Sequence, residues 1–160
     1  MKTAVVYYSM SGNTQYAAEK IAKGLGADLI RIEPKKAYPD QGMKKFFWGG
    51  KSAMMGEKPK LMPYEFRAED YDRIIIGTPV WARSFAPPIR TFIVQNPELR
   101  GKKIAALISF SGGGADKAGA KLRAAIGIEQ LEAELVLIDP KDRPDEANDA
   151  KIEEFCKKLQ

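Results

Sequence analysis

The sequence contains no histidine and a single cysteine, Cys156, among its 160 residues. The absence of imidazole excludes a Ser-His-Asp or Cys-His arrangement and any histidine acid–base pair. One cysteine forms no internal disulfide, and without histidine it disfavours a transition-metal site built from protein ligands. We therefore expect no metal site and no catalytic side chain, so that any chemistry is carried by a bound cofactor.

Long apolar runs are also absent. No segment reaches the length needed to cross a membrane, and the chain opens on a strand-like segment instead of the layout of a signal peptide. With 44% hydrophobic and 29% charged residues, the composition is typical of a globular domain of ordinary size. We expect one domain, residues 1–160, with a cytoplasmic location and no membrane contact.

Strand-like and helix-like segments alternate along the chain. The predicted strands are residues 3–8, 28–32, 73–78, 103–110 and 133–138, and the predicted helices are 14–25, 87–95, 116–126 and 144–159. The strand 73–78 is continuously apolar at its centre, which is typical of a strand covered on both faces. This βα alternation predicts a five-stranded parallel sheet with helices on both faces, an α/β fold in three layers. Ligands of such sheets bind beyond the carboxyl ends of the strands.

The first of these carboxyl ends leads into a hydroxyl-rich turn, which comprises Ser9, Met10, Ser11, Gly12, Asn13 and Thr14. Backbone N–H groups in such a turn, together with the N-terminus of the following helix, favour a phosphate group. No lysine or arginine occurs between Thr3 and Gln15, so this turn would bind phosphate through neutral donors alone. The P-loop spacing is missing, which argues against a nucleoside triphosphatase. The alternative is an ordinary strand-to-helix turn in which Thr14 or Asn13 caps the helix.

The loops after the third and fourth strands belong to the same edge of the sheet. The first contains Thr78, Pro79, Val80, Trp81, Ala82 and Arg83, and the second contains Ser109, Phe110, Ser111, Gly112, Gly113 and Gly114. The indole of Trp81 offers a flat stacking face, and the glycines allow the backbone to approach a ligand closely. Because the three loops share one edge, they favour a phosphate attached to a flat aromatic ring over simple packing of Trp81.

These segments resemble the flavodoxin family over nearly the whole chain. The resemblance rests on Val-Val-Tyr-Tyr-Ser-Met-Ser-Gly-Asn-Thr at residues 5–14, on the stretch 71–81 that ends in Gly-Thr-Pro-Val-Trp, and on the glycine loop 109–114. It implies a doubly wound sheet with strand order 2-1-3-4-5 and noncovalently bound FMN. It also implies that the turn 9–14 surrounds the FMN phosphate, that Trp81 lies against the flavin and that the loop 109–114 borders the pyrimidine end of the ring.

The resemblance further implies an electron-transfer protein that cycles FMN through one-electron states and acts with redox partner proteins, as a monomer or weak dimer. The alternative is an FMN-dependent oxidoreductase that takes hydride from NAD(P)H and reduces a quinone or a similar small molecule. The short chain and the Trp81 loop favour the carrier, whereas the lack of a clear second stacking aromatic favours the enzyme. A flavin-binding module with no redox partner is a third interpretation.

Three features depart from typical members of that family. Many carry a second aromatic residue, usually Tyr, in the loop after the fourth strand; here Phe110 is the only candidate, and its position at the strand end allows it to point into the core. The electron carriers of the family are usually strongly acidic, while this chain has a formal net charge of +5. Finally, a long connection joins the second and third strands, from about residue 34 to residue 70.

The basic excess of the chain is concentrated in this connection. Between Pro34 and Pro63 two acidic residues, Asp40 and Glu57, face a larger set of lysines: Lys35, Lys36, Lys44, Lys45, Lys51, Lys58 and Lys60. We expect a short helix within residues 43–55 and either a solvated face or a docking surface for a redox partner with an acidic face. Nucleic acid is not expected as a partner, because the charges are all lysine and no nucleic-acid-binding module accompanies them.

Positive charge near a flavin favours its anionic, fully reduced state. Arg83 follows Trp81 by two residues, and we expect it, together with the lysines of the connection, to make the second reduction easier than in acidic flavodoxins. The alternative for Arg83 is an exposed side chain paired with a nearby carboxylate.

Overall fold

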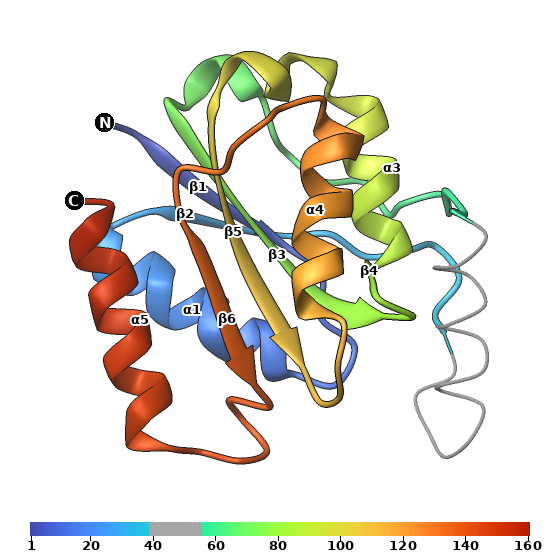
Figure 1. The fold of residues 1–160 in the computed structure, drawn as a ribbon. Helices are drawn as coiled ribbons and strands as arrows, with labels where there is room; N and C mark the ends of the chain where they lie inside the picture. Colours follow the sequence, from blue (N-terminus) through green and yellow to red (C-terminus); the bar gives the residue numbers. More distant parts are fainter. Residues whose placement is uncertain (39–55) are drawn as a thin grey trace.

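The structure is a computed structural model that describes residues 1–38 and 56–160. Its parallel strands are β1 (Thr3–Tyr7), β2 (Asp28–Arg31), β3 (Arg73–Trp81), β5 (Lys103–Phe110) and β6 (Glu134–Ile138). Its α-helices are α1 (Asn13–Leu25), α3 (Pro87–Gln95), α4 (Ala115–Ile126) and α5 (Glu146–Lys158). Short 3-10 helices occur at Ala68–Asp70 and Pro97–Gly101. Figure 1 shows these elements as three layers, with the sheet in the middle.

The fold prediction is confirmed. The parallel strands lie in the order β2-β1-β3-β5-β6, which is the expected order 2-1-3-4-5 counted over parallel strands alone. The sequence did not predict β4 (Ser84–Phe85), which pairs antiparallel with the end of β3. Because of this pairing, β3 continues to Trp81 instead of ending at Thr78.

The two faces of the sheet are covered by different helix pairs. In β3, Ile75 packs into the cluster shared with α1 and α5, whereas Ile74 and Ile76 pack into the cluster on the side of α3 and α4. All three side chains are fully buried. Since successive residues of a strand point to opposite faces, a strand buried on both sides has to be apolar at every position. This explains the unbroken Ile-Ile-Ile run.

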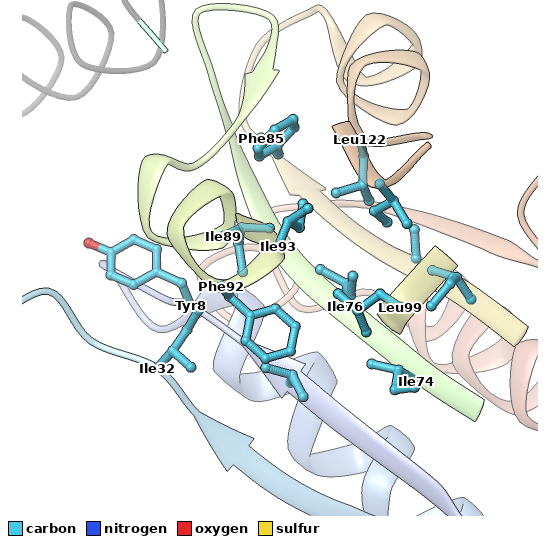
Figure 2. Close-up of a cluster of buried hydrophobic side chains, with 14 of the residues drawn as sticks. Tyr8, Ile32, Ile74, Ile76, Phe85, Ile89, Phe92, Ile93, Leu99 and Leu122 are labelled. Carbon is cyan, nitrogen blue, oxygen red and sulfur yellow. The ribbon is translucent and has the colours of Figure 1, made fainter. Parts of the chain in front are cut away.

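Figure 2 shows the core between the sheet and α3, where Ile89, Phe92 and Ile93 of that helix meet Ile76 of β3. Burial of a large apolar side chain contributes about 1.5–3 kcal/mol to stability. This core supports β3, whose last residue is Trp81.

The long connection between β2 and β3 is closed at its base. Pro34 and Leu61 form an antiparallel bridge, and the backbone N–H of Lys35 donates to the carbonyl of Lys60 at 2.8 Å. The expected helix within residues 43–55 lies outside the described residues. Within the described ranges, no helix is long and apolar enough to cross a membrane.

Candidate cofactor site

A cavity of about 300 Å³ opens at the carboxyl edge of the sheet. Its walls come from the carboxyl ends of β3 and β5 and from the segments that follow β1, β3, β5 and β6. It is lined by Ser9, Met10, Ser11, Asn13, Thr14, Pro79, Val80, Trp81, Ala82, Ser109, Phe110, Ser111, Asp139 and Asp142. Its size lies at the lower end of the range for small-molecule sites in proteins. The three loops that the sequence singled out therefore meet around one space.

The turn after β1 is organised by Ser9. Its buried hydroxyl oxygen accepts hydrogen bonds from the backbone N–H groups of Gly12 and Gln15, both at 3.2 Å. Gly12 has a φ of 97°, which is accessible to glycine at no steric cost, and α1 begins at the next residue. The turn thus presents hydroxyl groups and the amide end of a helix to the cavity, which suits an anion.

Thr14 and Ser109 join the first and third loops. Their hydroxyl oxygens lie 2.6 Å apart, both side chains are buried, and either hydroxyl can donate to the other. A helix start and a strand end are thereby linked directly across the cavity floor. The hydroxyl of Thr14 thus holds the Ser109 side chain, and both residues line the cavity.

The indole of Trp81 is fixed by two other aromatic rings. The ring centroid of Tyr8 lies 5.6 Å away and that of Tyr38 lies 5.2 Å away, and both pairs are edge-to-face. Burial raises the pKa of the Tyr8 phenol well above its usual value, so Tyr8 remains a neutral packing partner. Edge-to-face contacts of this kind contribute about 0.5–1.5 kcal/mol each beyond burial. Trp81 is therefore held rigidly as one wall of the cavity.

The Trp81 loop is a tight hairpin supported from below by Thr78. The Thr78 hydroxyl accepts from the N–H of Ala86 at 2.9 Å and donates to the carbonyl of Pro79 at 2.8 Å. Thr78 is fully buried beneath the loop and does not line the cavity. Its role in the structure is to hold the hairpin, which in turn positions Trp81.

The loop after β6 supplies two carboxylates that the sequence analysis did not select, those of Asp139 and Asp142. The buried Asn13 amide holds this loop: its Oδ1 accepts from the N–H groups of Lys141 at 2.9 Å and Asp142 at 3.1 Å, and its Nδ2 donates to Asp142 Oδ2 at 3.0 Å. Asp139 pairs with Arg143, with 3.2 Å between carboxylate oxygen and Nε. This loop also follows the carboxyl end of a strand, and that rule applied to the fifth strand would have found it.

Besides Thr78, the predicted site residues that do not line the cavity are Gly12, Arg83, Gly112, Gly113 and Gly114. Gly112 and Gly113 are exposed beyond Ser111, and Gly12 and Gly114 support their turns with φ of 97° and 93°. Arg83 is exposed at the tip of the hairpin and packs closely on Gly114, where an added Cβ would lie 2.7 Å from Arg83 Cγ. Phe110 is only partly buried and lines the cavity, so it is not a core residue.

The structure places a cation beside the turn of residues 9–14, for which the sequence predicted neutral donors alone. The turn itself contains no cation, but the structure brings one from far along the chain. Lys141 Nζ donates to the carbonyl of Ser11 at 3.3 Å and lies against Gly12. The sequence prediction considered only residues close to the turn along the chain. The fold brings the loop after β6, and with it Lys141, beside the turn.

The sequence profile of the flavodoxin family matches residues 2–145, so the chain belongs to the flavodoxin family. Solved structures with the same fold include a flavoprotein of Lactobacillus acidophilus NCFM in complex with FMN. The two sequences are 23% identical, the match covers 88% of this chain and 95% of that chain, and the TM-score is 0.73. A flavoprotein candidate of Bacteroides uniformis ATCC 8492 shares 20% identity over 98% and 97% of the two chains, with a TM-score of 0.77. Oxidised flavodoxin 2 of Bacillus cereus shares 21% identity over 99% and 97%, with a TM-score of 0.62.

Proposed function

We propose that this chain binds FMN in the cavity at the carboxyl edge of its sheet and serves as an electron-transfer protein. The observation that carries the proposal is that a hydroxyl-rich helix start and the rigid indole of Trp81 face the same space. FMN, when bound, supplies the capacity to accept and donate electrons singly or in pairs. Family membership and the FMN complex of the Lactobacillus acidophilus flavoprotein support the choice of cofactor.

The residues present fit the two chemically different parts of FMN. Hydroxyl groups of Ser9, Ser11 and Thr14, together with the amide end of α1, provide donors for the phosphate. Trp81 and Phe110 provide aromatic surface for the ring system, with polar groups of the Ser109 loop at its edge. Gly112, Gly113 and Gly114 belong to the same loop, and their contact with the cofactor is part of the proposal.

The same proposal assigns the chain redox partner proteins with acidic docking faces. The described ends of the β2–β3 connection expose Lys35, Lys36, Lys58 and Lys60, and Arg83 is exposed beside the cavity loops. Basic residues around a redox centre speed encounter with an acidic partner and make the association sensitive to salt. The other lysines of this connection lie outside the described residues.

The alternative proposal is a reductase that oxidises NAD(P)H and passes two electrons to a small molecule. Anaerobic photoreduction of the FMN-loaded protein, followed through its visible spectrum, separates the two functions. For the carrier we expect a long-wavelength band of one-electron-reduced flavin that accumulates and then fades. Direct bleaching to the two-electron-reduced state, with turnover of NAD(P)H in the same preparation, would contradict the carrier and support the reductase.

A further inference from the structure

Lys141 is placed beside the phosphate turn by two independent features of the structure. Its backbone is fixed because Asn13 Oδ1 accepts its N–H at 2.9 Å and also accepts the N–H of Asp142. Its side chain lies along Gly12, where an added Cβ would be 2.8 Å from Nζ and 3.1 Å from Cδ. Glycine at position 12 therefore leaves the space that the lysine occupies.

The ammonium group of Lys141 retains free hydrogen-bonding capacity at this position. It donates to the carbonyl of Ser11 at 3.3 Å, and an ammonium has three donors. Among the residues that the structure describes, no carboxylate forms an ion pair with it. The carboxylates nearby in the loop are engaged elsewhere, Asp139 with Arg143 and Asp142 with Asn13.

The charges around the cavity determine how much a cation such as Lys141 contributes to phosphate binding. Asp139 and Asp142 both line the cavity; Arg143 pairs with Asp139, whereas Asp142 is bound by the neutral amide of Asn13, so its negative charge opposes the entry of a phosphate dianion. The N-terminus of α1 offsets only about half an elementary charge. Lys141 does not itself line the cavity, but its ammonium group lies against Gly12 of the turn, so a phosphate bound by this turn would have a full positive charge beside it.

We propose that Lys141 binds the phosphate of the flavin and gives this site its preference for FMN over riboflavin, an inference that rests on the proposed FMN site. Lys141 acts from outside the turn, through the loop that Asn13 fastens to it. The phosphate is then held by neutral donors of the turn on one side and by the ammonium group of Lys141 on the other. This arrangement also predicts that FMN binding weakens as ionic strength rises, because the lysine is exposed.

The test is an equilibrium titration of the cofactor-free full chain with FMN and, separately, with riboflavin, followed by quenching of flavin fluorescence. For Lys141→Met we expect FMN affinity to fall by about 5- to 20-fold, the range for one charge-assisted contact at an exposed site, with riboflavin affinity within about twofold of wild type. Lys141→Arg, which keeps the charge, retains most of the FMN affinity. Lys157→Met is the matched control, because it removes the same charge from the last turn of α5 and leaves both affinities unchanged.

Two results would overturn the inference while leaving the FMN site intact. One is tight FMN binding by wild type and by Lys141→Met alike. The other is an equal loss of both flavins in Lys141→Met, which would mean that the lysine only supports the loop. A wild-type chain that binds neither flavin would overturn the proposed function, and the role of Lys141 would fall with it.

Discussion

Two adjacent residues in the hairpin between β3 and β4, Ala82 and Arg83, have left-handed backbone conformations with φ of 49° and 61°. They form a two-residue connection, since Trp81 pairs with Ser84 across it. Asparagine and glycine are the usual residues of such turns, and other residues carry strain of about 1–2 kcal/mol each. The strain is located beside the cavity, where the hairpin holds Trp81 and packs against Gly114.

Replacing Arg83 by glycine is expected to raise the free energy of unfolding by about 0.5–1 kcal/mol. Relief of the left-handed strain outweighs the larger conformational entropy of glycine in the unfolded chain. Urea denaturation measures the change. Ala124→Gly at an exposed position of α4 is the control and should lower stability by about 1 kcal/mol, because that residue is helical. A loss of stability in Arg83→Gly similar to that of the control would contradict the assignment of strain.

Arg73 and Glu132 form an ion pair at the opposite edge of the sheet. Arg73 is 6% exposed, and its Nε and Nη2 donate to the two carboxylate oxygens of Glu132 at 2.7 and 2.6 Å. Its Nη1 donates to the carbonyl of Leu159 at 2.7 Å, which ties the chain end after α5 to β3. The hydrogen bonds from Arg73 lower the pKa of Glu132.

Arg73→Met should lower the free energy of unfolding at neutral pH by about 2–3 kcal/mol, because it leaves Glu132 and the Leu159 carbonyl without their partner. Because the pKa of Glu132 is lower in the folded than in the unfolded protein, the ion pair stabilises the fold fully at pH values above the ordinary glutamate pKa. This stabilisation is lost as the pH falls through the pKa of Glu132 in the folded protein. The difference between wild type and variant should therefore shrink on acidification below about pH 4.5. Chemical denaturation at several pH values measures it. Arg67→Met is the control: it removes an exposed ion pair with Glu69 and should change the free energy of unfolding by less than 1 kcal/mol. An equal loss of stability in both variants would contradict the role assigned to the buried pair.

At the scale of elements, the start of α1 is set by how closely it approaches β3. An added Cβ at Gly77 would lie 2.9 Å from Tyr7 Cβ and 3.3 Å from Thr14 Cγ2. Glycine is therefore needed here for close packing and not for its backbone freedom, since its φ is not positive. Thr14 also carries the hydroxyl that meets Ser109 on the cavity floor.

Gly77→Ala should destabilise the protein by about 1–3 kcal/mol, the range for overpacking, and should also weaken FMN binding because the first turn of α1 is displaced. Thermal unfolding and FMN titration measure the two effects. Gly101→Ala is the matched control, because an added Cβ there meets nothing within 4 Å. A variant at position 77 that keeps wild-type stability and affinity would show that the helix start adjusts without loss.

The elements also show how far the sequence could predict the site. The segments at the carboxyl ends of β1, β3 and β5 could be predicted as parts of the site. Each follows an apolar run and is rich in Ser or Gly or contains Trp, which is a signal local to the sequence. The loop after β6 could be placed at the same edge by its position after a strand, but its residues carry no local signal of this kind. Its part in the site arises from the contacts of Asn13 with residues more than 120 positions away. β4 was equally hidden, because its turn of Ala82 and Arg83 lacks the Asn-Gly pattern that predicts a tight hairpin.

For the whole molecule, the cavity exists only when the fold is complete. Its walls follow four different strands, and the contacts between them, such as Thr14 with Ser109 and Asn13 with Asp142, join distant parts of the chain. An unfolded chain offers no such site, so a bound cofactor stabilises the folded state. At a free FMN concentration 100 times the dissociation constant the gain is about 2.7 kcal/mol.

The most direct test of the account is an equilibrium titration of the wild-type chain and of Thr14→Val with FMN, followed by quenching of flavin fluorescence. We predict saturation at one FMN per wild-type chain. Binding by the variant should be clearly weaker, because valine keeps the shape of threonine but removes its hydroxyl from the cavity floor. Thermal unfolding of both proteins without FMN serves as the control for folding. Absence of FMN binding by a folded wild-type chain, or equal affinity in the two proteins, would contradict the site.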